Sequence, residues 1–297
     1  MNTASILIKR NVKLFFKDKG MFFTSLITPL ILLVLYATFL GNVYRDSFMM
    51  NLPSTVKLPN ELIDGLVGGQ LTSSLLAVSC VTVAFSSNFL MVQDKVNGSI
   101  KDFRISPVKP YVLSLSYYAA SLISTLLICL VTVLICFIYL AVVGWYLSVA
   151  DIFLLLLDIA LLVLFGTALS SIINFFLSSQ GQISAVGTIV SAGYGFICGA
   201  YMPISSFGVG LQKFLLFLPG TYGTALLRNH SMRGALLEMQ NYGVTNNTIE
   251  ELKDALDSNL YFFGEKVNIE TMYAILGGTV IVLIGIYVWL NYIKRKS

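Results

Sequence analysis

The chain has 297 residues, of which 56% are hydrophobic and only 11% are charged, and its mean hydropathy is +0.81. Soluble domains carry about 25% charged residues, so this composition excludes a soluble globular protein and indicates a membrane protein with several spans. The net charge of +4 is small, and its distribution along the chain is more informative than its sum.

Residues 1–20 predict a basic amphipathic helix on the cytoplasmic membrane surface. Arg10, Lys13 and Lys17 recur on one side of a helical wheel, and apolar residues gather on another. A basic flank that only sets the orientation of the chain is the alternative. We expect no cleavable signal peptide, because charges continue to Lys19 before the first apolar run begins.

Long uncharged runs predict six transmembrane helices and therefore an all-α polytopic membrane protein, which we treat as one transmembrane domain over residues 1–297. Pro203 is expected to end the fifth span. Residues 204–222 are apolar but broken, which predicts a re-entrant helical hairpin before the last span. Residues 223–270 are mostly polar and predict a solvent-exposed extracytoplasmic segment. The expected spans are 21–40, 67–92, 112–143, 152–176, 183–202 and 271–293.

The basic residues predict the orientation of these spans. The N-terminus, the segment 93–110 and the C-terminal tail together carry twelve of the nineteen Lys and Arg but only three of the fifteen acids. Positive charge marks the cytoplasmic side of a membrane protein. We therefore expect both termini and the segment 93–110 to be cytoplasmic, in a multi-pass protein of the cell (plasma) membrane.

The segment 93–110, which we call the charged island, lies between two long uncharged runs. Ser99 and Asp102 have the spacing of a capping box, and Pro107 and Pro110 are expected to stop the helix that follows. A short cytoplasmic helix of this kind suits a docking surface for another protein, and a solvated linker between spans is the alternative. The side chains expected on that surface are Lys101, Asp102, Phe103 and Arg104.

Few residues suggest chemistry on the chain itself. The sequence has no G-x-x-x-x-G-K-[ST], G-x-S-x-G, H-E-x-x-H or paired Cys motif, so we expect no catalysis. His230 is the only histidine, and a zinc or haem site is not expected. Asp158 lies inside the fourth span and is a functional-site hypothesis, since intramembrane acids often are. The alternative interpretation is that Asp158 has a structural role near the outer interface, where its carboxylate is solvated or bonded to Ser or Tyr hydroxyls.

The residues 93–108 read Gln-Asp-Lys-Val-Asn-Gly-Ser-Ile-Lys-Asp-Phe-Arg-Ile-Ser-Pro-Val. This pattern resembles the loop after the second span of ABC-2 type permeases, the membrane subunits of one exporter class of ATP-binding cassette transporters. A second block, Gly-Ala-Tyr-Met-Pro-Ile-Ser-Ser-Phe over 199–207, is similar to another motif of that family, as is Leu-Pro-Gly-Thr-Tyr over 218–222 followed by Arg228. Gly208 departs from the family, which often has a proline there before its re-entrant helix.

The resemblance implies two separate cytoplasmic ATPase subunits and a second permease, identical or related, besides membrane lipids and without nucleic acid. ATP and Mg²⁺ are expected on the partner ATPase, and no cofactor is expected on this chain. The resemblance places on the ATPase-coupling surface Asp94, Gly98, Lys101, Asp102, Phe103, Arg104 and Pro107. It places Pro203, Pro219 and Tyr222 along or at the gate of the pathway, where we also place Asp158.

The function that these features predict is that of a permease subunit in an ABC exporter of the multidrug-type branch. It is expected to move an amphipathic small molecule, drug or lipid outward. An ion-coupled carrier or channel that works without an ATPase is the alternative, and a membrane enzyme is a third reading. The scarcity of ionisable residues inside the spans argues against the carrier.

Overall fold

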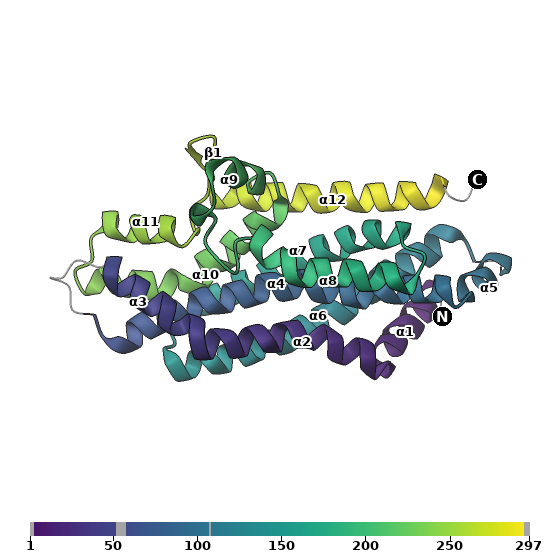
Figure 1. Cartoon of the computed structure of the whole chain (residues 1–297), viewed down its shortest axis with the longest axis horizontal. Helices are drawn as coiled ribbons and strands as arrows, with labels where there is room; N and C mark the ends of the chain where they lie inside the picture. Colours follow the sequence, from purple (N-terminus) through teal and green to yellow (C-terminus); the bar gives the residue numbers. More distant parts are fainter. Residues whose placement is uncertain (1–2, 52–57, 107, 294–297) are drawn as a thin grey trace.

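A computed structural model describes residues 3–51, 58–106 and 108–293, without the side chains of residues 37, 47, 50, 51 and 104. Helices packed lengthwise form an elongated bundle (Figure 1). The elements are α1 (Thr3–Lys17), α2 (Lys19–Leu35), the π-helical turn η1 (Tyr36–Leu40), α3 (Gly41–Asn51), α4 (Asn60–Val96), α5 (Ser99–Ile105), α6 (Pro110–Val143), α7 (Val149–Phe176), α8 (Gln180–Ile197), the 3₁₀ turn η2 (Ile204–Ser206), α9 (Val209–Leu215), α10 (Pro219–Asn241), α11 (Asn246–Ala255), β1 (Tyr261–Phe262), β2 (Glu265–Lys266) and α12 (Ile269–Ile293).

Within the described part of the chain, five helices are long and apolar enough to cross a membrane. A membrane core about 30 Å thick needs about 20 helical residues, and each of the five exceeds that length. The chain is therefore an all-α polytopic membrane protein. α8 has 18 residues and is not among the five, so the count of six spans stays a prediction. The five helical segments are Lys19–Asp46, Asn60–Val96, Pro110–Val143, Val149–Phe176 and Ile269–Ile293.

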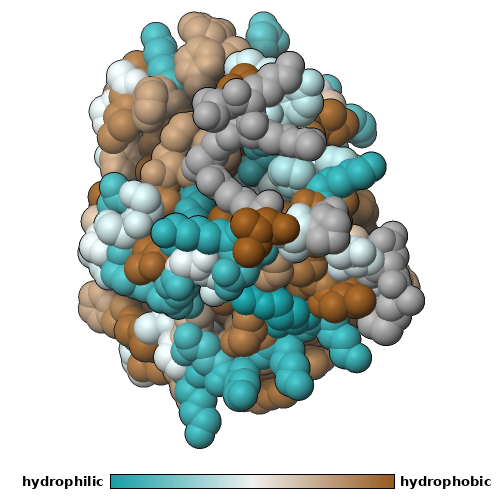
Figure 2. Space-filling model, turned by 90° about the vertical axis from the view of Figure 1, so that its right-hand side faces the viewer, coloured by the Kyte–Doolittle hydropathy of each residue, from teal (hydrophilic) through white to brown (hydrophobic). Residues whose placement is uncertain are grey.

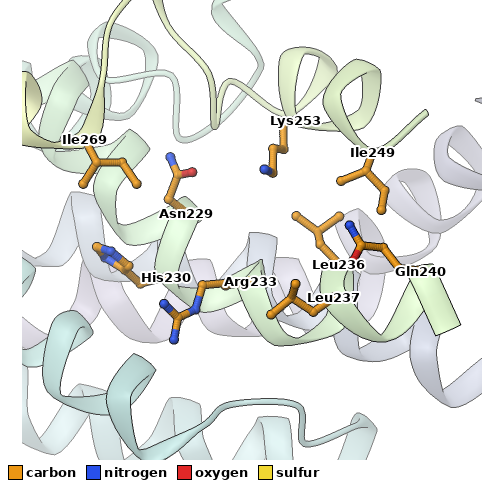
Figure 3. A pocket seen from close by; sticks show the side chains of 9 residues that line it. All are labelled: Asn229, His230, Arg233, Leu236, Leu237, Gln240, Ile249, Lys253 and Ile269. Carbon is orange, nitrogen blue, oxygen red and sulfur yellow. The ribbon is translucent and has the colours of Figure 1, made fainter. Parts of the chain in front are cut away.

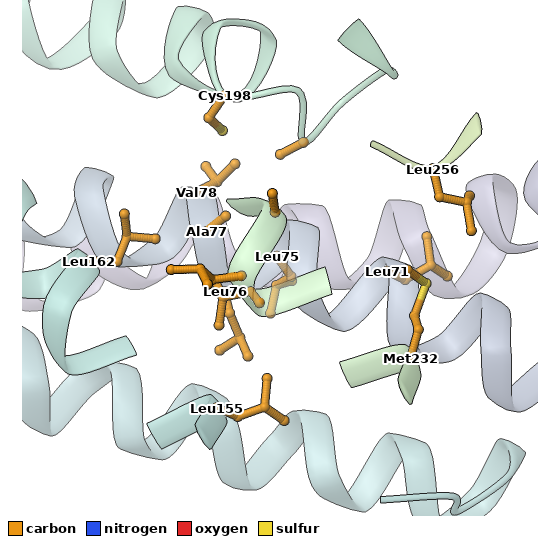
Figure 4. Packing of buried hydrophobic residues seen from close by; sticks show 14 of the residues in the cluster. Leu71, Leu75, Leu76, Ala77, Val78, Leu155, Leu162, Cys198, Met232 and Leu256 are labelled. Carbon is orange, nitrogen blue, oxygen red and sulfur yellow. The ribbon is translucent and has the colours of Figure 1, made fainter. Parts of the chain in front are cut away.

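The central element is α4, a helix of 37 residues that is buried along most of its length. It contacts α2, α6, α7, α8 and α10. Leu75 and Leu76 of α4 lie in one buried cluster with Leu155 and Leu162 of α7 and Met232 of α10 (Figure 4). Many small side chains on α4 suit this position, because Gly and Ser let membrane helices approach closely.

A loop between α6 and α7 lies against both α4 and α10, and glycines make room for it. A Cβ atom on Gly65 of α4 would come within 2.7 Å of the Tyr146 ring. On Gly234 of α10 it would clash with the carbonyl oxygen of Tyr146. Tyr146 therefore approaches both helices at distances that only glycine allows.

The structure corrects two expectations about the region after α8. Pro203 does not end the helix, because α8 already stops at Ile197 and Gly199 turns the chain with a φ of +73°. The segment 223–270 is not exposed throughout. α10 runs from Pro219 to Asn241, and Met232, Leu236 and Met239 are buried on it. Polar residues of α10 reach buried acids on other elements, so a polar stretch can pack inside.

The two ends of the bundle differ in what they carry. The start of α1, the helix α5 and the end of α12 lie at one end, and α11 lies toward the other (Figure 1). Figure 2 looks onto the first of these ends, where hydrophilic side chains gather among hydrophobic ones. We call it the α5 end.

Candidate functional site

Asp94 lies in the last turn of α4 and holds three helices together. Its carboxylate accepts a hydrogen bond of 2.7 Å from Nη1 of Arg10 on α1 and one of 2.5 Å from the hydroxyl of Tyr117 on α6. The hydrogen bond to Asp94 raises the pKa of Arg10. Asp94 itself is only 5% exposed. The charge of Asp94 is therefore compensated inside the protein, and its place on the ATPase-coupling surface stays a prediction.

The next residue, Lys95, fixes the other side of the same helix end. Its Nζ donates hydrogen bonds of 2.8 Å to the carbonyl oxygens of both Asn174 and Phe175, and one of 3.1 Å to that of Leu177. These carbonyls form the C-terminal end of α7, where a cation is favoured by the helix dipole. Neighbouring residues of opposite charge thus tie α4 to α1 and α6 on one side and to α7 on the other.

α5 follows at once, although not with the cap that the sequence predicts. Gly98 is the N-cap residue, with a φ of +82° and no side chain to accept a hydrogen bond, and Ser99 is already helical. The expected capping box of Ser99 and Asp102 is therefore absent. Pro110 does not stop a helix but begins α6, where its missing N–H costs nothing. Pro107 lies outside the described residues.

One side of α5 packs against α1, and the other side is exposed. Phe103 is half-buried, and the guanidinium of Arg10 lies 5.1 Å from the centre of its ring, a cation–π distance. Lys101 and Asp102 are exposed, and Ile105 is 88% exposed. The prediction that Phe103 is exposed is therefore wrong. Phe103 packs against Arg10 and anchors α5, whereas Ile105 is an apolar side chain that is exposed. The side chain of Arg104 is outside the described part.

Asp158 lies in α7 and is fully buried. One carboxylate oxygen is 2.6 Å from Nδ1 of His230 on α10, and the other accepts a hydrogen bond of 2.5 Å from the hydroxyl of Tyr273 on α12. A Tyr partner fits the structural interpretation of Asp158, and the His partner was not foreseen. The three side chains connect three helices through one polar cluster.

A second buried cluster joins the two motif blocks after α8. Arg228 of α10 is 1% exposed and lies 3.3 Å from a carboxylate oxygen of Asp257, while its other terminal nitrogen donates to the Gly199 carbonyl. The same Asp257 oxygen accepts a hydrogen bond of 2.5 Å from the backbone N–H of Ile204. Burial raises the pKa of Asp257, and the charge of Arg228 opposes that effect. Arg228 and Asp257 thus hold the turn around Pro203.

The remaining predicted gate residues belong to the local structure around this turn. Pro203 precedes η2, and Pro219 is the first residue of α10. Tyr222 is buried and donates a hydrogen bond of 2.7 Å to the Leu216 carbonyl. The structure therefore brings Pro203 close to the Arg228 cluster, while Asp158 belongs to a separate cluster with His230.

Residues 3–230 match the family model of the ABC-2 type transporter, which is well over half of the chain. The chain belongs to the ABC-2 type transporter family. The resemblance seen in the motifs is thereby confirmed, and the chain is a membrane transport domain, the permease part of an ATP-binding cassette transporter. It has no significant match among curated proteins or among solved structures.

Several buried polar pairs in this ABC-2 type transporter cannot be predicted from the sequence. The sequence places Arg10 on a basic helix face and Lys95 in a motif, and it gives His230 no partner. The one available signal was the scarcity of such residues, since each polar group buried in a membrane protein needs a partner. In the ranges that the structure describes, no group of three or more His, Cys, Asp or Glu could hold a metal ion.

Proposed function

We propose that this ABC-2 type transporter chain is the permease of an exporter that moves an amphipathic small molecule, drug or lipid outward. Two separate ATPase subunits, which bind ATP and Mg²⁺, supply the energy, and a second permease, identical or related, completes the pathway. The complex sits in the plasma membrane with both termini and α5 cytoplasmic. α8 serves as a sixth span, and the segment 204–222 as a re-entrant hairpin.

The observation that supports this proposal most is the way in which α5 is fixed to α4 and α1. The helix follows directly on α4, whose end is held by Asp94 and Lys95, and it is held from the side by Arg10 over Phe103. A push on α5 is therefore transmitted to α4, which contacts most other spans. Packed helices shift as rigid bodies, so this geometry suits the transfer of movement from an ATPase to the spans.

Under this proposal the coupling residues have different tasks. Lys101, Asp102 and Ile105 are exposed and contact the ATPase directly. Asp94 and Phe103 position α5 from within. Gly98 supplies the left-handed turn between α4 and α5. Arg104 and Pro107 keep the docking role that the resemblance implies.

Co-purification with ABC ATPases that are expressed together with the chain tests the proposal without knowledge of the cargo. Ile105→Asp should remove the ATPase from the purified permease, because a charge replaces the free apolar contact. Phe263→Asp is the matched control, since Phe263 is 72% exposed and lies in the β hairpin away from α5. An unchanged ATPase content in Ile105→Asp would contradict the docking role. Transport by the chain alone, without ATP, would overturn the whole proposal.

The cluster around Asp158 favours a second candidate, an ion-coupled carrier that works without an ATPase. Chains of Asp, Glu and His residues inside a membrane protein mark proton pathways in pumps and transporters, and Asp158 is bonded to His230. Proteoliposomes that contain the chain alone decide between the two candidates. Dye uptake driven by an imposed proton gradient, and lost in Asp158→Asn, would support the carrier. Uptake only with the ATPase and ATP would support the exporter.

A further inference from the structure

A pocket of about 180 Å³ lies between α10, α11 and the start of α12, away from the α5 end. In Figure 3, α10 carries Asn229, His230, Arg233 and Gln240 along one side, and Lys253 of α11 points toward them from the other. This pocket takes no part in the coupling described above.

The lining of the pocket is basic within a region that is acidic. Residues 228–270 contain seven acids and four Lys or Arg. Two of these four basic residues, Arg233 and Lys253, line the pocket together with His230, and none of the seven acids does. We propose that the pocket binds a small anionic amphiphile, with a phosphate or carboxylate head between Arg233 and Lys253 and an apolar tail.

Both basic residues keep hydrogen-bond donors for such a head. Arg233 pairs through Nε with Asp151 at 2.6 Å, and a guanidinium has five N–H donors, of which one carboxylate uses at most two. Lys253 shares the carboxylate of Glu250 with Lys266, at 2.9 and 2.6 Å. An ammonium group has three N–H donors, and the pair with Glu250 uses one of those on Lys253.

Two carboxylates of α7 lie behind the lining and are not part of it. Asp151 is held by Arg233, and Asp158 is held by His230 and Tyr273. Both acids are almost completely buried. They hold the side chains of Arg233 and His230 in position, so this side of the pocket is preorganised before a ligand binds.

The apolar part of the lining determines the shape of the ligand. Leu236 and Ile249 are buried in the wall, while Leu237 and Ile269 are exposed at the rim. Pockets for drug-sized ligands usually measure roughly 300–1,000 Å³, so this one is too small to enclose a whole drug. The head and the first carbons of a chain fit inside, and a longer tail lies over the rim.

Such a ligand has two sources, a free anionic amphiphile or the headgroup of an anionic lipid. The measurement uses purified chain in phosphatidylcholine nanodiscs, without an ATPase, so its failure leaves the exporter proposal untouched. Hexyl phosphate is titrated by calorimetry and should bind. Hexyltrimethylammonium, which has the opposite charge, should not bind, and inorganic phosphate should bind more weakly because it lacks the tail. Nanodiscs with added phosphatidylglycerol should weaken hexyl phosphate binding if lipid headgroups occupy the pocket.

Lys253→Gln should weaken hexyl phosphate binding about tenfold, as expected for loss of a charge-assisted hydrogen bond. Lys266→Gln is the matched control, because Lys266 also pairs with Glu250 but does not line the pocket. Leu236→Asn adds a second variant, which should weaken hexyl phosphate more than inorganic phosphate. Equal hexyl phosphate binding by wild type, Lys253→Gln and Leu236→Asn would overturn the proposal, as would equal binding of hexyltrimethylammonium.

Discussion

The guanidinium of Arg10 lies 5.1 Å from the centre of the Phe103 ring. Arg10 belongs to the first helix of the chain and Phe103 to α5, so this contact joins the surface helix to the proposed docking helix. The same guanidinium bonds Asp94 at the end of α4. Arg10 thus orients α5 relative to the central span.

Arg10→Gln should destabilise the protein, because the almost buried carboxylate of Asp94 loses its cation. An unsatisfied buried polar group costs about 1–3 kcal/mol, which should appear as a lower Tm in nanodiscs. Lys9→Gln is the control, since Lys9 is exposed on the same helix. Adding Asp94→Asn to Arg10→Gln should recover part of the loss. A Tm for Arg10→Gln equal to that of Lys9→Gln would contradict the role of this ion pair.

Phe103→Ala and Ile105→Ala should have separable effects. Phe103 packs against Arg10, so its loss should lower Tm and also weaken the coupling between the ATPase and the permease. Ile105 is free, so its loss should leave Tm unchanged and reduce ATPase retention alone. Thermal unfolding and co-purification on the same samples measure both effects, and a lower Tm for Ile105→Ala would show that the two faces of α5 are assigned wrongly. The double variant Phe103→Ala, Arg104→Ala should uncouple ATP hydrolysis from export.

Gly234→Ala should destabilise the bundle, since its Cβ would clash with the Tyr146 carbonyl oxygen. Overpacking of this kind costs about 1–3 kcal/mol. Gly277→Ala is the matched helical control, because a Cβ there meets nothing within 4 Å. Its Tm should be unchanged or slightly higher, since Ala is the better helix former by about 1 kcal/mol. Similar Tm values for the two variants would show that α10 and the loop at Tyr146 are not in close contact.

Arg228→Met should be among the most destabilising single changes, because it leaves Asp257 buried without its cation. Breaking one partner of a buried pair costs about 3–5 kcal/mol. Asp257 has a raised pKa, so the penalty in Arg228→Met should shrink as pH falls and the carboxyl takes up a proton. Asp257→Asn in the same chain should restore part of the stability, because Asn tolerates the φ of +51° found there. Unfolding of the wild type, Arg228→Met and the double variant at two pH values checks this prediction.

Glu250 makes the stability of the α11 region depend on pH. Hydrogen bonds from Lys266 and Lys253 lower its pKa to about 2. A carboxyl with a lowered folded-state pKa adds stability above its unfolded value of about 4.5, and this contribution fades as pH falls toward about 2. Wild type should therefore exceed Glu250→Gln in Tm near neutral pH. The side chain is half exposed, so we expect a gap below about 1 kcal/mol. A Tm gap that grows on acidification would contradict this sign.

Much of the span arrangement could be predicted from local sequence. Charge-free runs gave α6, α7 and α12 within a few residues of their bounds, because a membrane span needs about 20 apolar residues in succession. The predicted ends of α4 and α8 differ more from the observed ones. α4 continues through Asp94 and Lys95 to Val96, since both charges find partners, so a charged residue did not end the helix.

The candidate site was predicted only in part. A short helix in the charged island was foreseen, as was its place between two spans. Which of its side chains are free was not, because α1 covers Phe103 from a distant part of the sequence. Burial of α10 was missed for the same reason, since Arg228 and His230 look solvent-exposed until Asp257 and Asp158 are placed beside them.

The sequence by itself determined the class of the protein, the position of most spans and the family, because these depend on composition and on short contiguous motifs. Only the tertiary structure decided which charges are compensated inside the bundle and which remain free. Arg10 meets Asp94 across 84 positions and His230 meets Asp158 across 72. Such pairings depend on how helices pack against each other, and no local periodicity records them.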